Sequence, residues 1–396
     1  MNFTGKITHL FSLLAATVLL LFSLRRWLFL LAALWPGNRP PGVATPYSPP
    51  VLLLVPVRNE AAALPGLLRR LAQLDYPAGR LVVAFINDGS TDGSETLLQA
   101  AAAGQANWHL LSLPENIGKA AALNAALDAF SAGDLVVIFD ADERPHPAAL
   151  RHLAQPFANP AVGGVSGRRA VNNDLASPAA SYTAFEGLVH QFITLAAKDR
   201  LNLAPALLGA NCAYRRAALR QVGGFTPGAL LEDTDLTVRL ARAGWRTRFT
   251  PAAVSRHQVP QTVSGYWRQH TRWARGFNDV ARAQGLAVAC DERLSLPLRL
   301  ELLAFALGYL DRPALLAAVL LAPGRRWLAG PIAISLISPL LQIVAALKLS
   351  NQPAALWLRL GWVPFFFGLD AAMAVAGVVN TLRRAPRRWE ERRQRR

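Results

Sequence analysis

Apolar residues gather near the two ends of this chain, and that distribution constrains its fold more than any other feature. They fill Ile7–Trp35 and Leu298–Val379, whereas residues 51–260 mix charges, turns and short apolar runs as soluble domains do. With 52% of its 396 residues hydrophobic, the chain is apolar for a wholly soluble protein. The sequence therefore predicts a globular middle held between membrane anchors.

The first anchor is predicted over Ile7–Leu24. Its 18 residues include only His9 as an ionisable group, and they are near the lower length for a spanning helix. A cleavable signal peptide is the alternative, but its basic residues come before the apolar run, whereas Arg25-Arg26 follow it here. Because basic flanks favour the cytoplasm, Arg25-Arg26 predict a cytoplasmic middle domain.

Two further spanning helices are predicted near the C-terminus. Leu328–Leu347 and Gly361–Val379 each approach the ~20 apolar residues that a span requires. A third run, Leu302–Leu321, contains Asp311-Arg312 at its centre, where charge is expensive in lipid. We therefore expect two short interfacial or re-entrant helices there.

The basic residues of the C-terminal part are consistent with two membrane crossings. Arg325-Arg326 precede the first span and the tail Arg383–Arg396 follows the second, so both are expected in the cytoplasm. The tail has eight Arg and two Glu, which gives +6 of the net charge of +17. Attraction to anionic lipid fits this position, and no nucleic-acid motif accompanies the charge. Cys212 and Cys290 offer neither a disulfide framework nor a CxxC metal site, as fits a reducing cytoplasm.

The middle of the chain alternates predicted strands and helices. Continuous apolar runs predict buried parallel strands at Val51–Val57, Leu81–Ile86 and Leu135–Phe139. Helical patterns occupy Ala61–Leu74, Ser94–Ala103 and Gly118–Phe130. This alternation predicts an α/β fold with a mostly parallel sheet.

Polar clusters follow the predicted strands, at the edge where open α/β sheets bind ligands. These clusters are Pro56–Glu60, Asn87–Asp92 and Asp140–Asp142. No GxGxxG follows the first strand and no GxxxxGK[ST] occurs, so a dinucleotide oxidoreductase and a P-loop NTPase lose their main support.

Three carboxylates in these clusters are candidate ligands. Asp88 fits an ordinary tight turn, but at a strand end it can also accept hydrogen bonds from a nucleobase or ribose. Asp140 and Asp142 are two residues apart, so strand alternation predicts that both side chains point to one side. Such a pair suits Mg²⁺ bound together with substrate phosphates, and a solvated strand end is the alternative.

Two later motifs add acid–base and phosphate-binding groups. Glu232-Asp233 opens an amphipathic helix over Leu236–Ala243, and the pair suits either helix capping or a general base for an acceptor hydroxyl. Gln269–Trp273 contains Arg272 and a tryptophan, which suit either a membrane interface or a diphosphate and a sugar ring.

Together these segments resemble the motifs of the membrane-bound family 2 glycosyltransferases, which include synthases of cellulose, hyaluronan, chitin oligosaccharides and poly-N-acetylglucosamine. The resemblance covers roughly residues 50–285 in motif order. Its segments are Pro56–Glu60, Asn87–Ser90, Asn116–Lys119, Asp140–Asp142, Glu232-Asp233 and Gln269–Trp273. Asn87 departs from the second Asp of many members, and His257–Pro260 departs from an acidic residue before the proline.

The resemblance implies a GT-A fold and an inverting transfer from a nucleotide-diphosphate sugar, expected to be a UDP-sugar. It implies that Asp233 is the general base, and that Asp140 and Asp142 bind Mg²⁺ or Mn²⁺. The implied donor-binding residues are Asp88, Lys119, Asp140, Asp142, Gln269 and Arg272. The implied acceptor-binding residues are Tyr214, Glu232 and Trp273.

Five parts are expected along the chain. They are an N-terminal transmembrane segment (1–35), a cytoplasmic GT-A catalytic domain (36–260), a segment with the QxxRW motif of Gln269–Trp273 and interfacial helices (261–325), two transmembrane helices (326–382) and a basic cytoplasmic tail (383–396). The expected location is the plasma membrane of a bacterium.

A synthase that extends a poly- or oligosaccharide at the membrane is the leading functional interpretation. Its alternative is a glycolipid synthase similar to ceramide glucosyltransferase, because about three spans are few for a wide channel. A nucleotide-binding regulator without activity is the alternative from another class. The intact Asp142, Asp233 and Arg272 count against that regulator, since the groups that the chemistry needs are present.

Overall fold

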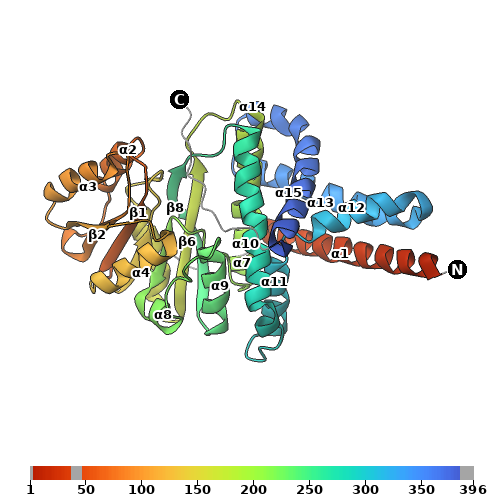
Figure 1. Cartoon of the computed structure of the whole chain (residues 1–396), viewed down its shortest axis with the longest axis horizontal. Helices are drawn as coiled ribbons and strands as arrows, with labels where there is room; N and C mark the ends of the chain where they lie inside the picture. The colour runs from red at the N-terminus through yellow and green to blue at the C-terminus, as the bar shows by residue number, and fades with distance from the viewer. Residues whose placement is uncertain (1–2, 37–46, 384–396) are drawn as a thin grey trace. The chain divides into compact units, whose positions relative to one another are not determined.

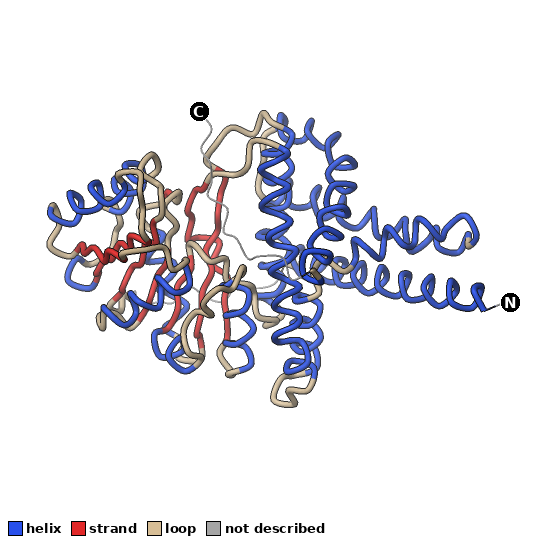
Figure 2. The backbone as a smooth tube through the Cα atoms, in the orientation of Figure 1, coloured by secondary structure: helices blue, strands red, loops and turns tan. Residues whose placement is uncertain are grey.

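The computed structural model describes residues 3–36 and 47–383, which form two compact units. The sheet unit contains residues 47–172 and 204–258, and the helical unit contains residues 3–36, 173–203 and 259–383. Figure 2 distinguishes the strands, in red, from the helices, in blue. From the sequence, residues 173–203 are expected in the catalytic domain, but they belong to the helical unit. Of the predicted basic tail, residues 384–396 lie outside the described residues.

One eight-stranded mixed sheet, in the order β3-β2-β1-β4-β7-β6-β8-β5, forms the centre of the sheet unit (Figure 1). β1 pairs in parallel with β2 and β4, β2 with β3, and β6 with β8, whereas β7 and β5 run antiparallel to their neighbours. The strands are β1 (Val51–Val57), β2 (Leu81–Asp88), β3 (Trp108–Leu113), β4 (Leu135–Ile138), β5 (Arg144–Pro145), β6 (Val162–Val171), β7 (Cys212–Arg215) and β8 (Arg246–His257). The predicted α/β fold with a mostly parallel sheet is confirmed.

Helices pack on both faces of this sheet, which explains why β1 is a continuous apolar run. Leu53 packs in one core with Leu64 of α2, and its neighbour Leu52 packs in a second core with Leu123 of α4. A strand whose successive residues enter two cores needs apolar residues at every position. The helices of this unit are α2 (Leu64–Leu71), α3 (Ser94–Ala103), α4 (Lys119–Ala129), α5 (Ala149–Ala154), α8 (Arg216–Gln221) and α9 (Glu232–Arg242).

Within the described residues, the helical unit contains three helical segments long and apolar enough to cross a membrane. They are Gly5–Leu34, Arg326–Leu349 and Ala354–Leu382. The main helices of the unit are α1 (Phe3–Leu34), α6 (Pro178–Leu188), the π-helix η3 (Val189–Leu195), α7 (Ala196–Arg200), α10 (Val263–Ala289), α11 (Leu296–Ala306), α12 (Asp311–Leu321), α13 (Ala329–Leu349) and α15 (Val363–Leu382). α11 and α12 are bent by 72° at their junction, as expected for a broken span or a re-entrant loop.

Arg25 and Arg26 lie within the first helix and not after its end, contrary to the prediction. The sequence predicts that they flank a span ending at Leu24, but α1 continues to Leu34, so both arginines lie inside the candidate span. α1 packs along α12 and α13 (Figure 1). Arg25 Nε lies 2.7 Å from Glu301 Oε2 of α11, and Arg26 pairs with Asp311 of α12. Because carboxylates compensate the two cations, the helix does not have to end before them.

Candidate active site

The loops after β1 and β2 are joined by hydrogen bonds at the carboxyl edge of the sheet. Asn59 Oδ1 accepts a hydrogen bond from the Thr91 amide at 2.8 Å, and Ser90 Oγ accepts one from the Asn59 amide at 3.1 Å. Asn59 has a φ of 52°, in the left-handed region that Asn tolerates better than most residues. The polar clusters that sequence places at two strand ends therefore form one connected surface.

Asp88, at the end of β2, holds the loop that leads into α4. Its Oδ1 accepts a hydrogen bond from the Ile117 amide at 2.8 Å, and its Oδ2 accepts one from the Gly118 amide at 3.0 Å. Gly89 makes this approach possible, since it has a φ of +63° and a Cβ there would lie 2.7 Å from the Asn116 amide nitrogen. Asp88 thus fixes the N-terminus of α4, where Lys119 is the first helical residue.

Lys119 joins three segments of the site. Its Nζ lies 2.8 Å from Asp140 Oδ1, 3.0 Å from the Gly209 carbonyl oxygen and 3.3 Å from Glu232 Oε1. Burial alone would lower the pKa of Lys119, but Asp140 and Glu232 raise that pKa above its ordinary value. The ammonium group therefore remains charged among these carboxylates.

Asp140 and Asp142 lie in a turn, because β4 ends at Ile138. Strand alternation therefore does not orient their side chains, contrary to the prediction. The Asp140 side chain remains 32% exposed, whereas Asp142 is 6% exposed. Asp140 Oδ2 also lies 3.9 Å from Arg169 Nη2 of β6. One carboxylate of the pair is thus open to a ligand and the other is mostly buried.

Glu143 is a member of this cluster that sequence reasoning missed. It is fully buried, its Oε1 accepts a hydrogen bond from Arg169 Nε at 2.7 Å, and its Oε2 accepts one from the Ser255 hydroxyl. Burial raises the pKa of Glu143 to about 7, with Arg169 opposing this shift and Asp142 adding to it. The available signal was a third acidic residue directly after Asp142, but its partners come from β6 and β8, far along the chain.

Glu232 and Asp233 begin α9 at the same edge of the sheet. Glu232 faces Lys119, and a Cβ added to Gly209 would lie 2.9 Å from Asp233 Oδ2. Gly209 has a φ of +69° and accepts a hydrogen bond from Lys119, so the chain approaches Asp233 closely there. Asp235 is tied into the fold instead, since its Oδ2 accepts hydrogen bonds from Thr226 and Arg239.

The structure thus brings Lys119, Asp140, Glu232 and Asp233 together, with Asp88 fixing the loop that delivers Lys119. Tyr214 lies close enough to interact electrostatically with Asp233 and Glu232, but it is completely buried on β7, with its ring 5.6 Å from that of Phe225. Its ring lies in the core, and the acceptor role implied for Tyr214 stays a prediction. The remaining predicted residues, Gln269, Arg272 and Trp273, lie on α10 of the helical unit, and their roles stay predictions.

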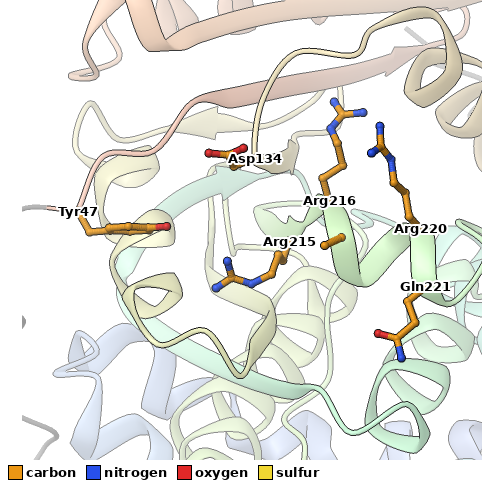
Figure 3. A pocket seen from close by; sticks show the side chains of 7 residues that line it. Tyr47, Asp134, Arg215, Arg216, Arg220 and Gln221 are labelled. Atoms are coloured by element: carbon orange, nitrogen blue, oxygen red, sulfur yellow. The ribbon is translucent and has the colours of Figure 1, made fainter.

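A cavity of about 700 Å³ lies at the other end of the strands (Figure 3). Its lining includes Asp134, which directly precedes β4, and Arg215 and Arg216. Arg215 donates hydrogen bonds to the carbonyl oxygens of residues 157, 159 and 162, and Arg216 donates one to that of residue 133. These arginines are held by the backbone, and the cavity lies away from the carboxylates after β4. We therefore place the site at the carboxyl edge.

The chemistry of the donor set fits a divalent cation. Five carboxyl groups lie around three cations, and even with Glu143 protonated the cluster keeps an excess of negative charge. The carboxyl groups are those of Asp140, Asp142, Glu143, Glu232 and Asp233, and the cations are Lys119, Arg144 and Arg169. Carboxylate oxygens are the ligands that Mg²⁺ and Mn²⁺ prefer, so Asp140 and Asp142 can hold such an ion.

Comparison with known proteins gives consistent matches. Residues 49–276, more than half of the chain, match the model described as Glycosyltransferase like family 2. An N-acetylglucosaminyltransferase of Rhizobium leguminosarum bv. viciae is 31% identical over 259 residues, 63% of this chain and 60% of that protein. The beta-monoglucosyldiacylglycerol synthase of Synechocystis sp. is 29% identical over 235 residues, 58% of this chain and 48% of that protein. The chain spans about half to three fifths of the curated relatives' lengths.

A solved structure agrees with these matches over nearly the whole chain. It is a mannosyltransferase from Pyrobaculum calidifontis in complex with GDP-Man and Mn²⁺, with a TM-score of 0.67 and 25% identity. The match covers 96% of this chain and 99% of that one. The predicted GT-A-type fold with flanking apolar helices is confirmed.

Proposed function

This chain belongs to glycosyltransferase like family 2, and on that basis we propose that it transfers a sugar from a nucleotide-diphosphate donor to an acceptor glycan at a membrane. The observation that carries the proposal is the meeting of Lys119, Asp140 and Glu232, with Asp233 next in the chain, at the carboxyl edge of the sheet. This edge is where open α/β sheets bind nucleotides. Three apolar helical segments support the membrane location.

The donor is proposed to bind between the loops after β2 and β4. The N-terminus of α4, which Asp88 holds in place, presents backbone amides and Lys119, and helix N-termini favour phosphate groups. Asp140 and Asp142 would hold Mg²⁺ or Mn²⁺, which supplies charge neutralisation for the leaving diphosphate. The Mn²⁺ in the mannosyltransferase complex supports this metal class.

Asp233 is proposed as the general base. Its carboxylate takes the proton of the acceptor hydroxyl while the acceptor oxygen forms a bond to the anomeric carbon of the sugar. The bond between that carbon and the diphosphate oxygen breaks, and the nucleoside diphosphate leaves with the electron pair. Attack opposite to the leaving group inverts the anomeric configuration. Glu232 pairs with Lys119 at 3.3 Å and completes the charge around the donor phosphates.

A lipid acceptor is the second candidate. The similarity to a beta-monoglucosyldiacylglycerol synthase supports it, whereas the similarity to N-acetylglucosaminyltransferases and to a poly-beta-1,6-N-acetyl-D-glucosamine synthase of Staphylococcus aureus supports a glycan. The donor is proposed to be a UDP-sugar, and GDP-mannose is the competing donor because the mannosyltransferase was solved with it.

The purified chain in native lipid vesicles provides the test, with radiolabelled UDP-N-acetylglucosamine, UDP-glucose and GDP-mannose in separate reactions. One donor is expected to lose its sugar, with the label recovered in water-soluble glycan. Label recovered as a singly glycosylated lipid would select the second candidate. The proposal is wrong if no donor transfers its label and each nucleotide sugar binds the chain no more tightly than the free sugar does.

A further inference from the structure

The helical unit contains a second cluster of metal-ligand side chains, separate from the carboxylates of the sheet unit. Glu186 of α6, His270 of α10 and Asp370 of α15 each place one ligand atom within 4.8 Å of the other two. These helices are far apart in the sequence, so the cluster is a product of their packing. The proposed catalytic function does not use it.

Two polar atoms in the cluster lack a hydrogen bond. His270 Nε2 and Glu186 Oε2 are both buried and lie 3.4 Å apart, yet neither has a hydrogen-bond partner among the residues that the structure describes. His270 as a whole is only 3% exposed, whereas the Glu186 side chain is 31% exposed. A buried polar atom without a partner costs ~1–3 kcal/mol, so an occupant that binds both atoms is favoured.

Asp370 is held in place by two tyrosines. The Tyr182 hydroxyl donates to Asp370 Oδ2 at 3.0 Å, and the Tyr266 hydroxyl donates to Oδ1 at 2.7 Å. The His270 ring stacks on the ring of Tyr266, with the centroids 3.9 Å apart. Around metal sites, outer hydrogen bonds commonly orient ligating carboxylates and imidazoles in this way.

We propose that Glu186, His270 and Asp370 bind a transition-metal dication of the Zn²⁺ class, which joins α6, α10 and α15. One imidazole nitrogen with two carboxylate oxygens suits Zn²⁺ better than Mg²⁺ or Ca²⁺, which prefer oxygen ligands throughout. The ion adds positive charge beside the carboxylates of Glu186 and Asp370, which otherwise have Arg312 as their neighbouring cation. Since α10 also carries Gln269, Arg272 and Trp273, the ion fixes the helix that bears this motif.

Zinc retention by the full-length chain in detergent tests this site without any measurement of activity. The background is Asp140→Asn with Asp142→Asn, so that the proposed catalytic ion cannot contribute. After equilibration with Zn²⁺ and gel filtration, about one zinc ion per chain is expected by mass spectrometry. His270→Gln or Asp370→Asn should weaken zinc binding by more than about 100-fold, and Tyr266→Phe by about 10–100-fold, as for the loss of an outer partner.

His190→Gln is the matched control, because His190 lies in the same unit but outside the cluster. It should retain zinc unchanged. Glu186→Gln provides a second ligand variant if Asp370→Asn unfolds, and circular dichroism identifies such a case. A chain that holds no zinc, as expected if a proton is shared between Glu186 and His270, would overturn the proposal, as would equal retention by all folded variants.

Discussion

Lys119 Nζ lies 2.8 Å from Asp140 Oδ1, which joins the N-terminus of α4 to the turn after β4. The same ammonium group reaches the Gly209 carbonyl and Glu232, so one cation connects the segments that would hold donor and base. No local sequence motif predicts this pairing, because Lys119 and Glu232 are more than a hundred residues apart. The charge of Lys119 is therefore central to the proposed site.

Replacing Lys119 by Met should lower kcat/KM about 10–100-fold. A hydrogen bond to a charged group contributes ~1.5–3 kcal/mol, and each ~1.4 kcal/mol corresponds to a factor of ten. Lys119→Arg keeps the charge and is the matched control, which should lose less. Initial rates at several donor concentrations measure the effect. Equal rates for Lys119→Met and the unsubstituted chain would show that the ammonium is dispensable.

Removing the proposed metal ligand Asp142 should lower activity more than removing Lys119 does. Asp142→Asn is expected to lower transfer at least about 100-fold, since a carboxylate next to the ion and the diphosphate contributes several kcal/mol. EDTA should abolish the activity of the unsubstituted chain, and excess Mn²⁺ should restore it. Full activity of the purified chain in EDTA would remove metal from the mechanism. Because the helical unit holds a second proposed ion, the Asp142 variant, rather than EDTA, assigns the effect to the sheet unit.

The ion pair between Glu143 and Arg169 should stabilise the folded chain. Arg169→Met leaves the buried Glu143 carboxyl without its cation, and breaking such a pair by removing one partner costs ~3–5 kcal/mol. Adding Glu143→Gln to the same chain should recover part of that loss. Thermal unfolding of both variants measures the difference. If Arg169→Met unfolds at the same temperature as the unsubstituted chain, the ion pair does not stabilise the fold.

The two cysteines provide a test of membrane orientation. Cys290 is exposed after α10, whereas Cys212 is buried in the sheet unit, and burial raises the pKa of its thiol to about 11. A membrane-impermeant maleimide should therefore label Cys290 alone, and Cys290→Ser should abolish labelling. With residues 36–300 in the cytoplasm, inverted vesicles should be labelled and intact cells should not. Labelling of intact cells would reverse the orientation.

Much of the sheet unit follows from local sequence. β1 and α3 begin and end where their patterns predict, since an uninterrupted apolar run and a helical period are local signals. The carboxylates after β2 and β4 were identified for the same reason, as parallel strands place their carboxyl ends at one edge. Glu143 was missed because its partners Arg169 and Ser255 become neighbours only when β6 and β8 pair.

In the helical unit, by contrast, local sequence did not predict where the first helix ends. Arg25 and Arg26 are read from sequence as the end of a membrane span, because a lone arginine is costly in lipid. Their carboxylate partners, Glu301 and Asp311, are separated from them by more than 270 residues. A pattern within one helix cannot reveal such compensation. The three candidate spans were predictable, whereas the limit of the first depends on distant partners.

The measurement that tests the central claim most directly compares donor binding and sugar transfer in Asp233→Asn. An amide cannot take the acceptor's proton, and general-base catalysis typically supplies ~10²–10⁴-fold, so transfer should fall by that factor. Asp233 lies in the first turn of α9 and is not its N-cap, which is Leu231, so the variant loses only a favourable charge at the helix N-terminus, worth ~0.3–1 kcal/mol, and should fold normally. Calorimetry should give an almost unchanged affinity for the donor, since Asp233 is proposed to contact the acceptor's hydroxyl and not the nucleotide. Transfer within about tenfold of the unsubstituted chain, with donor binding intact, would contradict the role of Asp233 as the base.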